Sequence, residues 1–119
     1  MQYLMLIYVE ESRWGTMSEA ERAKGSADYM AYTTAIQDSR HWVGGNRLAP
    51  TSSTTVVRVR DGKTTKTHGP FAETREQLGG YYLIEAKDLD EACAVAARCP
   101  GARHGTIEVR PISPLTPPA

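Results

Sequence analysis

Two stretches of the sequence, residues 2–9 and 78–86, are apolar at nearly every position, and they constrain the fold more than any other feature. Each is too short for a typical helix and rich in strand-forming residues, so each predicts a strand covered on both faces. Successive strand residues alternate in direction, so Tyr82 and Ile84 face away from Tyr81. The rest of the chain must therefore supply cover for two faces of one sheet.

Two helices are predicted, and both begin at a capping signature. Ser18 precedes Glu21 by three residues, and Asp88 precedes Glu91 by the same spacing, which lets each side chain bond a backbone N–H at a helix start. Small and apolar residues recur at helical spacing in the first helix: Ala20, Ala23, Ala27, Met30, Ala31 and Thr34. The elements predicted, in order, are strand 2–9, helix 18–39, strand 41–45, strand 54–60, strand 63–67, strand 78–86, helix 88–99 and strand 106–110.

This order, β-α-β-hairpin-β-α-β, predicts an α+β fold of the ferredoxin-like βαββαβ plan with an inserted hairpin. Asp61-Gly62 marks the hairpin turn, because both residues tolerate positive φ. The chain is interpreted as one domain over 1–112, followed by a proline-rich tail at 113–119. Two helices cover only one face of the sheet. We expect a homodimer to cover the other, and the alternative is a monomer in which 44–77 folds back over it.

Composition narrows the functional classes. Fourteen Lys and Arg balance fourteen Asp and Glu, and this zero net charge argues against a nucleic-acid partner. No apolar run is long enough for a transmembrane helix, and no signal peptide is recognised, so neither a membrane partner nor export is expected. Cys93 and Cys99 lack metal-ligand spacing, and no phosphate-binding loop occurs. The expectation is a cytoplasmic protein with no cofactor and no metal.

Residues 68–86, HGPFAETREQLGGYYLIEA, closely resemble the signature of the YCII-related family in its DGPF-type branch. The resemblance extends to the start of the chain (QYLMLIY), and to RVRDGK at 58–63, DLDEA at 88–92 and IEVRPI at 107–112. It implies a dimeric α+β barrel and a small cytoplasmic protein without assigned activity. Some genes of this branch lie beside sigma factors.

Two positions depart from the family pattern. The leading Asp of the motif is His68 here, and Tyr29 stands at the helix position that holds a His in a related branch. In that branch, the helix His and an acidic residue are suggested to form a catalytic pair. The present chain therefore does not carry that pair as such.

The loop that carries this signature holds the candidate catalytic residues. His68 or Glu73 could act as a general base, and Arg75 could bind a substrate carboxylate. The structural alternative is that Phe71 fills the core and that the charged side chains pair on the surface. Under that alternative the loop has no chemical role.

Aromatic residues supply the candidate substrate-binding positions, which are Trp42, Tyr82 and Phe71. Trp42 could line a pocket between helix and sheet, and the Tyr82 hydroxyl could orient a ligand. The alternative for Trp42 is a place in the core or at a dimer interface, and for Tyr82 it is aromatic packing beside Gly79 and Gly80.

The sequence is compatible with two functions. The first is a cofactor-independent acid/base or lyase-type enzyme acting on a small organic acid. The second is a non-catalytic ligand-sensing or interaction module, associated with sigma-factor regulation. A pocket in which acid and base side chains converge favours the first, and a pocket without them favours the second.

Overall fold

The computed structural model describes residues 1–115 and confirms the α+β prediction. In chain order the elements are β1 (Gln2–Val9), α1 (Glu11–Thr16), α2 (Glu19–Asp38), β2 (Trp42–Arg47), the 3-10 helix η1 (Thr51–Ser53), β3 (Thr55–Arg60), β4 (Lys63–His68), β5 (Gln77–Glu85), α3 (Leu89–Ala97), the 3-10 helix η2 (Pro100–Arg103) and β6 (Thr106–Pro111). The predicted tail at 113–119 lies partly outside the described residues.

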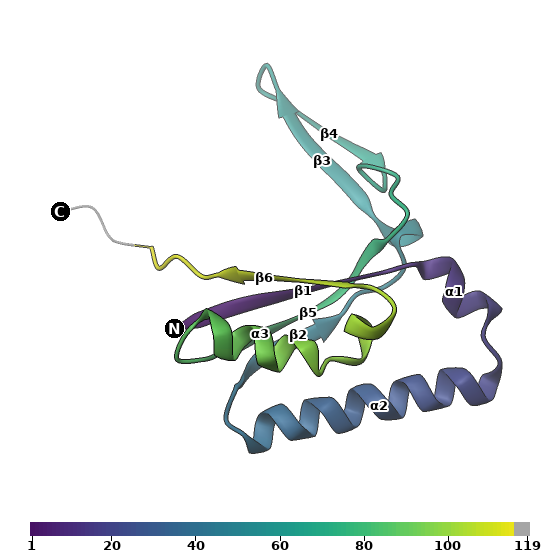
Figure 1. The fold of residues 1–119 in the computed structure, drawn as a ribbon. Helices are drawn as coiled ribbons and strands as arrows, with labels where there is room; N and C mark the ends of the chain where they lie inside the picture. The colour runs from purple at the N-terminus through teal and green to yellow at the C-terminus, as the bar shows by residue number, and fades with distance from the viewer. Residues whose placement is uncertain (116–119) are drawn as a thin grey trace.

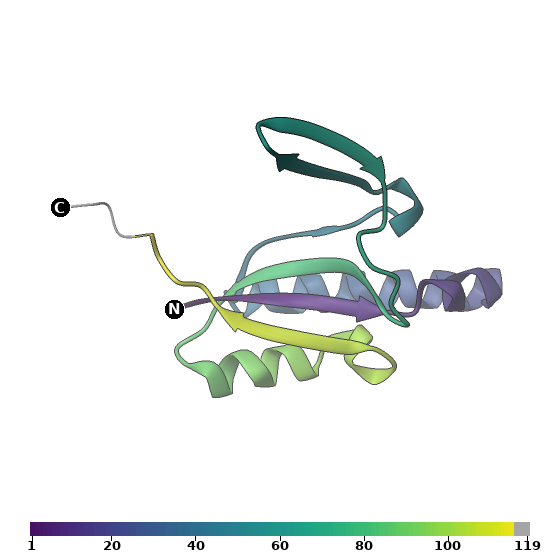
Figure 2. The ribbon, with the colours of Figure 1, turned by 90° about the horizontal axis from the view of Figure 1, so that it is seen from above.

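Four strands form one antiparallel sheet in the order β2-β5-β1-β6, which is the ferredoxin-like order. Helices α2 and α3 lie on one face of this sheet, and no α-helix among residues 1–115 lies on the opposite face (Figures 1 and 2). Two helices thus cover one face only, as the sequence pattern predicts.

Within the described residues, no helix is both long and apolar enough to cross a membrane.

The core lies between the sheet and the two helices. Met5 of β1 and Ile84 of β5 are fully buried from the sheet side, and Ile36 and Val95 meet them from the helices. On the open face, the same strands place half-buried apolar side chains opposite one another, such as the pair Leu4 and Leu83. The prediction of central strands that are apolar on both faces is confirmed.

Helix α2 begins at the predicted capping box. The Ser18 hydroxyl accepts from the Glu21 N–H, and the Glu21 carboxylate accepts from the Ser18 N–H. The small and apolar residues that recur at helical spacing from Ala20 to Thr34, here called the small-residue stripe, face solvent, and Met30 is 72% exposed. The helix is held to the sheet by Tyr32 and Ile36, its two buried residues. Alanine and methionine suit a helix whichever side they face, so their spacing was a weak guide to the buried side.

Strands β3 and β4 form a separate two-stranded hairpin that stands off the main sheet (Figure 1). The predicted Asp61-Gly62 turn is confirmed, with φ of 54° at Asp61 and 73° at Gly62. Viewed from above, the hairpin lies on the side of the sheet opposite the helices (Figure 2). Helix α1, the 3-10 helices η1 and η2 and the separation of this hairpin from the sheet are features of the fold that the sequence pattern did not predict.

Candidate functional site

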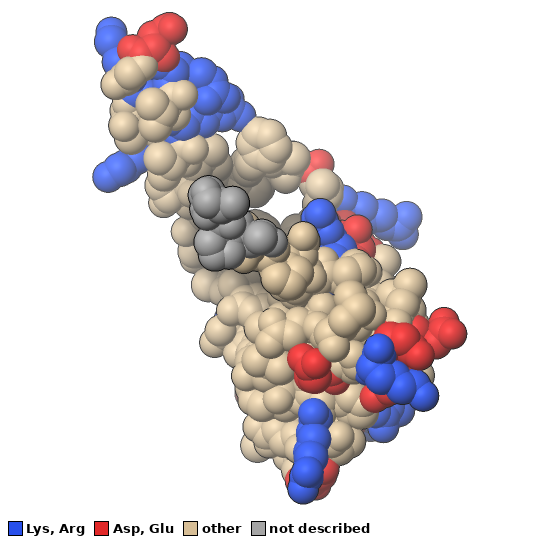
Figure 3. All heavy atoms as spheres, turned by 90° about the vertical axis from the view of Figure 1, so that its left-hand side faces the viewer, with Lys and Arg blue, Asp and Glu red and all other residues tan. Residues whose placement is uncertain are grey.

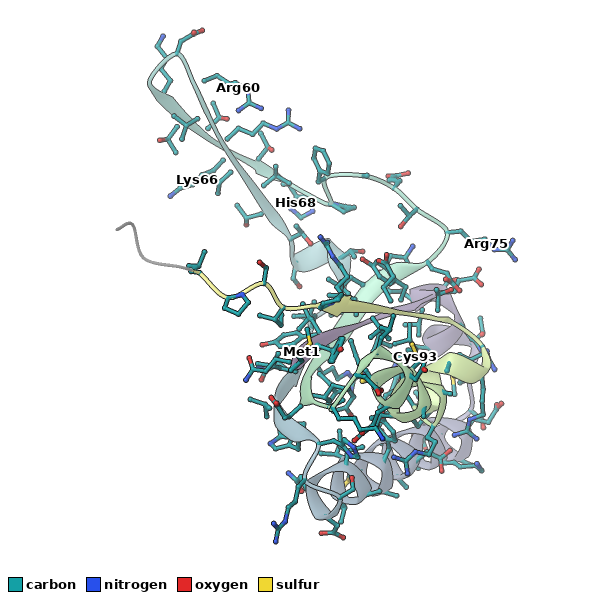
Figure 4. All side chains as sticks on the ribbon, turned by 60° about the vertical axis from the view of Figure 1, so that its left-hand side comes forward. Met1, Arg60, Lys66, His68, Arg75 and Cys93 are labelled. Atoms are coloured by element: carbon teal, nitrogen blue, oxygen red, sulfur yellow. The ribbon has the colours of Figure 1, made fainter. Side chains whose placement is uncertain are left out.

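The three candidate catalytic residues lie outside the core and do not converge. His68 ends β4, and Glu73 and Arg75 follow in the exposed loop that leads to β5. Figure 4 shows Arg75 pointing outward into solvent, away from His68. Within residues 1–115, none of the three makes a side-chain hydrogen bond or ion pair. Within one chain, the loop therefore presents three separate groups rather than an assembled acid/base pair.

Phe71 is 75% exposed, so the alternative in which it fills the core is wrong. Its ring lies beneath the guanidinium of Arg58, whose Cζ is 5.3 Å from the ring centroid. This cation–π contact ties the signature loop to β3. Phe71 therefore packs against Arg58 of β3 and not in the core.

The structure brings the other two aromatic candidates together in the core. The rings of Trp42 and Tyr82 meet edge to face with centroids 5.7 Å apart. The Tyr82 hydroxyl shares a 2.8 Å hydrogen bond with Thr33 of α2. Burial raises the pKa of Tyr82, so its hydroxyl stays protonated. This pair packs on the helix side of the sheet beside Gly45, apart from His68.

A hollow of about 370 Å³ lies beside the signature loop. One wall comes from the connection between β2 and β3, and the other comes from the loop and the start of β5. Its lining residues are Leu48, Ala49, Pro50, Thr51, Ser53, Thr54, Ala72, Thr74, Gln77 and Leu78. None of these carries an ionisable side chain, so the hollow combines apolar and hydroxyl or amide surface.

Glu11 holds the two walls of this hollow together. Its carboxylate accepts hydrogen bonds from the backbone N–H of Thr51, at 2.8 Å, and from the Thr51 hydroxyl, at 2.7 Å. Its own backbone N–H donates to the Gln77 side-chain oxygen at 2.9 Å. The first residue of α1 thus fixes both η1 and the first residue of β5. No pattern in the sequence predicts these contacts, because Glu11, Thr51 and Gln77 are far apart along the chain.

Two of the four hydroxyl groups in the lining already donate their hydrogen to the protein, and the other two can donate or accept. The Thr51 hydroxyl donates to Glu11, and the Thr74 hydroxyl donates to the Glu76 carbonyl, so each keeps lone pairs but no free hydrogen. The hydroxyls of Ser53 and Thr54 make no side-chain hydrogen bond to any described residue. The hollow therefore offers both donors and acceptors to a ligand hydroxyl group, and it offers no cationic side chain to an anion.

A second cluster, Ser39, His41 and Glu91, was not anticipated. The Ser39 hydroxyl lies 2.7 Å from His41 Nδ1, and His41 Nε2 lies 2.8 Å from a Glu91 carboxylate oxygen. The carboxylate can only accept, so in the neutral imidazole Nε2–H donates to Glu91 and Nδ1 accepts from Ser39. The sequence feature that bears on this cluster is the predicted cap at Asp88, which places Glu91 in the first turn of α3.

The order hydroxyl, imidazole, carboxylate resembles a nucleophilic triad, but its surroundings do not suit one. The backbone N–H groups of Ser39, Arg40 and His41 all donate to carbonyls of α2, so they cannot stabilise an oxyanion. Ser39 also caps the carboxyl end of α2, where the helix dipole disfavours negative charge. The cluster therefore fastens the turn between α2 and β2 to α3.

This cluster predicts an acid-sensitive contribution to stability. The hydrogen bond from His41 holds the pKa of Glu91 below its ordinary value of 4.5. A carboxyl group with a lowered folded-state pKa adds stability that is complete above the ordinary value and is lost as pH falls through the lowered value. We expect Glu91→Gln to lower Tm at neutral pH, and the difference from wild type to shrink in acid. Thermal unfolding followed by circular dichroism across pH measures this.

The matched control is Asp90→Asn, which changes the neighbouring first-turn carboxylate, for which the structure shows no hydrogen-bonded partner among residues 1–115. This variant should keep the wild-type dependence of Tm on pH. Identical pH profiles for the two variants would contradict the assignment to the His41 contact.

No group of three or more His, Cys, Asp or Glu side chains among residues 1–115 could hold a metal ion. The candidate site of the described chain is therefore the hollow beside the signature loop, with His68, Glu73 and Arg75 around it rather than in its lining. Of the predicted site residues, none lines this hollow, although Ala72 and Thr74 alternate with Glu73 and Arg75 along the loop.

Comparisons with known proteins agree with this architecture. Residues 1–116 match the YCII-related domain. An uncharacterized protein, R00369, of Rhizobium meliloti (strain 1021) is 35% identical over 119 residues, which cover 98% of this chain and 96% of that protein. The fold is similar to that of TftG, the 5-chloro-2-hydroxyhydroquinone dehydrochlorinase of Burkholderia phenoliruptrix AC1100, solved in complex with 2,5-dihydroxybenzoquinone. That likeness has a TM-score of 0.56 and 14% identity, and covers 95% of this chain and 94% of TftG. The chain belongs to the YCII-related family.

Proposed function

We propose that the chain binds a small hydroxylated organic molecule in the hollow beside the signature loop. The observation that carries this proposal is the composition of the lining, which has apolar walls and hydroxyl acceptors but no ionisable side chain. Leu48, Pro50 and Leu78 supply apolar surface for a flat or aliphatic ligand body. The lone pairs of Thr51 and Thr74 accept from ligand hydroxyl groups.

The proposed function is ligand binding without catalysis, because no acid/base pair converges in the described chain. A link to sigma-factor regulation would follow from the DGPF-type branch, to which we assign the chain on its signature at 68–86. A cytoplasmic location is part of the same proposal. The proposed ligand class is also consistent with the dihydroxybenzoquinone that the similarly folded TftG binds.

A thermal-shift screen tests the hollow directly. We expect 2,5-dihydroxybenzoquinone or a hydroxylated benzene to raise Tm by an amount that grows with ligand concentration, because a ligand that binds only the folded state stabilises it by mass action. Ser53→Trp should fill the hollow and abolish this shift while leaving the Tm of the free protein close to wild type, since Ser53 is exposed.

The control is Ser52→Trp, which places the same side chain on the neighbouring exposed residue of η1, outside the lining. This variant should keep the ligand shift. Loss of the shift in both variants, or in neither, would contradict binding in the hollow.

A second candidate function is acid/base chemistry of the lyase type, and the observation that favours it is the fold shared with a dehydrochlorinase. His68, Glu73 and Arg75 are its candidate groups. They would have to converge on a bound ligand by movement of their exposed loop. Chloride release from 5-chloro-2-hydroxyhydroquinone measures this activity, and His68→Ala and Glu73→Ala should each reduce it by about 10²-fold or more if they transfer protons. Turnover that survives both substitutions would reject this site.

We also propose that a second copy of the chain covers the open face of the sheet, as a homodimer. Leu4, Leu6 and Leu83 lie on that face and are only half-buried in one chain. Face-to-face packing of two such sheets would remove this surface from water in a closed, symmetric assembly. Sedimentation velocity at micromolar concentration distinguishes the dimer from a 13.1 kDa monomer.

A further inference from the structure

We propose that the β3–β4 hairpin is an arm that packs against the body of a second copy of this chain. The inference goes beyond sheet-to-sheet packing and rests on the homodimer proposed above. It assigns a separate contact to residues 55–68, which we call the arm. Three observations support it: the isolation of the arm, its exposed valines and its charge.

The arm makes little contact with its own chain. β3 and β4 pair with each other from Thr55–His68 to Arg60–Lys63, and no other described element packs along them. Every residue of β4 is exposed, and Val56 alone in β3 is not. An isolated two-stranded hairpin is marginally stable in water. A projecting hairpin of this kind gains stability by packing on another surface.

One face of the arm is suited to a protein surface. Val57 and Val59 are 57% and 58% exposed, and the pairing places both on the same face, opposite Lys66 and Thr64. The other face carries Arg58, which is already engaged by Phe71. The valine face is therefore the free one, and it places two exposed apolar side chains beside Lys66, a combination that a partner surface with apolar and acidic side chains can cover.

The charge of the arm complements that of the rest of the chain. Arm residues include four basic side chains, Arg58, Arg60, Lys63 and Lys66, against one acidic side chain, Asp61. The remaining residues carry ten basic and thirteen acidic side chains, which is an equal and opposite excess. Figure 3 shows the Lys and Arg side chains gathered on the hairpin, whereas both signs mix on the body.

This balance favours a second copy of the chain over a nucleic acid. Opposite excess charges on arm and body attract when the arm of one copy meets the body of another. Nucleic-acid binders interleave aromatic side chains with basic ones, whereas the free face of the arm carries valines. The partner that matches both an apolar face and a basic edge is the acidic body of another copy.

The test compares the dimer dissociation constant of arm variants by sedimentation equilibrium. Val57→Thr combined with Val59→Thr keeps β-branched side chains and should weaken the dimer about tenfold or more, because both arms lose apolar contact. Arg60→Glu combined with Lys66→Glu should also weaken the dimer. This effect should be larger at low salt than at high salt, because salt screens charge attraction. The same two positions changed to Gln should give an intermediate effect.

The matched control is Met30→Gln, which removes an even more exposed apolar side chain from α2 and should leave the dissociation constant unchanged. A wild-type protein that stays monomeric overturns both the homodimer and the arm. A wild-type dimer that all arm variants match overturns the arm alone and leaves sheet packing intact. Binding of a duplex oligonucleotide that the charge variants lose, with unchanged dimerisation, would assign the arm to nucleic acid and overturn the proposal.

Discussion

Gly105→Ala is expected to lower the free energy of unfolding by about 3 kcal/mol or more, because the site has no room for a methyl group. A Cβ at Gly105 would overlap the carbonyl oxygen of Tyr8 and would lie 3.1 Å from the carbonyl oxygen of Gly101. Both neighbours are backbone atoms, so no side-chain rotation relieves the clash. The turn between η2 and β6 would have to move away from β1, its hydrogen-bonded partner strand.

Gly25→Ala is the matched control, since nothing lies within 4 Å of a Cβ at that position in α2. Alanine is the better helix former, so this variant should gain up to about 1 kcal/mol. Urea unfolding followed by circular dichroism measures both changes. If the two substitutions shift the unfolding midpoint in the same direction, the close approach of Gly105 to β1 is contradicted.

The elements that the sequence predicted well are those whose signals are local. The capping box of Ser18 and Glu21 and the turn at Asp61-Gly62 each depend on a few adjacent residues, and both are confirmed. The central strands were equally clear, because an apolar run of their length has few alternatives. From these elements the ferredoxin-like order follows by the rules of connection.

The candidate site was less predictable, because its geometry depends on contacts between distant residues. Glu11 holds Thr51, which lies 40 positions away, and no pattern along the chain marks that contact. His41 and Glu91 are 50 positions apart. Their chemistry makes His68, Glu73 and Arg75 candidates, but the direction of side chains in an exposed loop is not set by sequence spacing.

The second large effect is expected at Ile36. This side chain is fully buried, and it is one of two residues through which the 20-residue helix α2 is anchored to the sheet. Ile36→Ala should cost about 2–5 kcal/mol, the usual range when a large aliphatic side chain is removed from a core. Since a domain of this size has a total stability of about 5–15 kcal/mol, a large share of it depends on this contact.

Met30→Ala tests the same helix on its other side. Met30 is 72% exposed, so its removal should change the free energy of unfolding by less than about 0.5 kcal/mol. Urea unfolding of both variants, at a protein concentration low enough to separate folding from self-association, decides which side of α2 is buried. A cost at Met30 equal to that at Ile36 would mean that the small-residue stripe is covered after all, and only a second molecule could cover it in this fold. Because such cover depends on protein concentration, repeating the measurement at higher concentration separates that case from a wrong orientation of the helix.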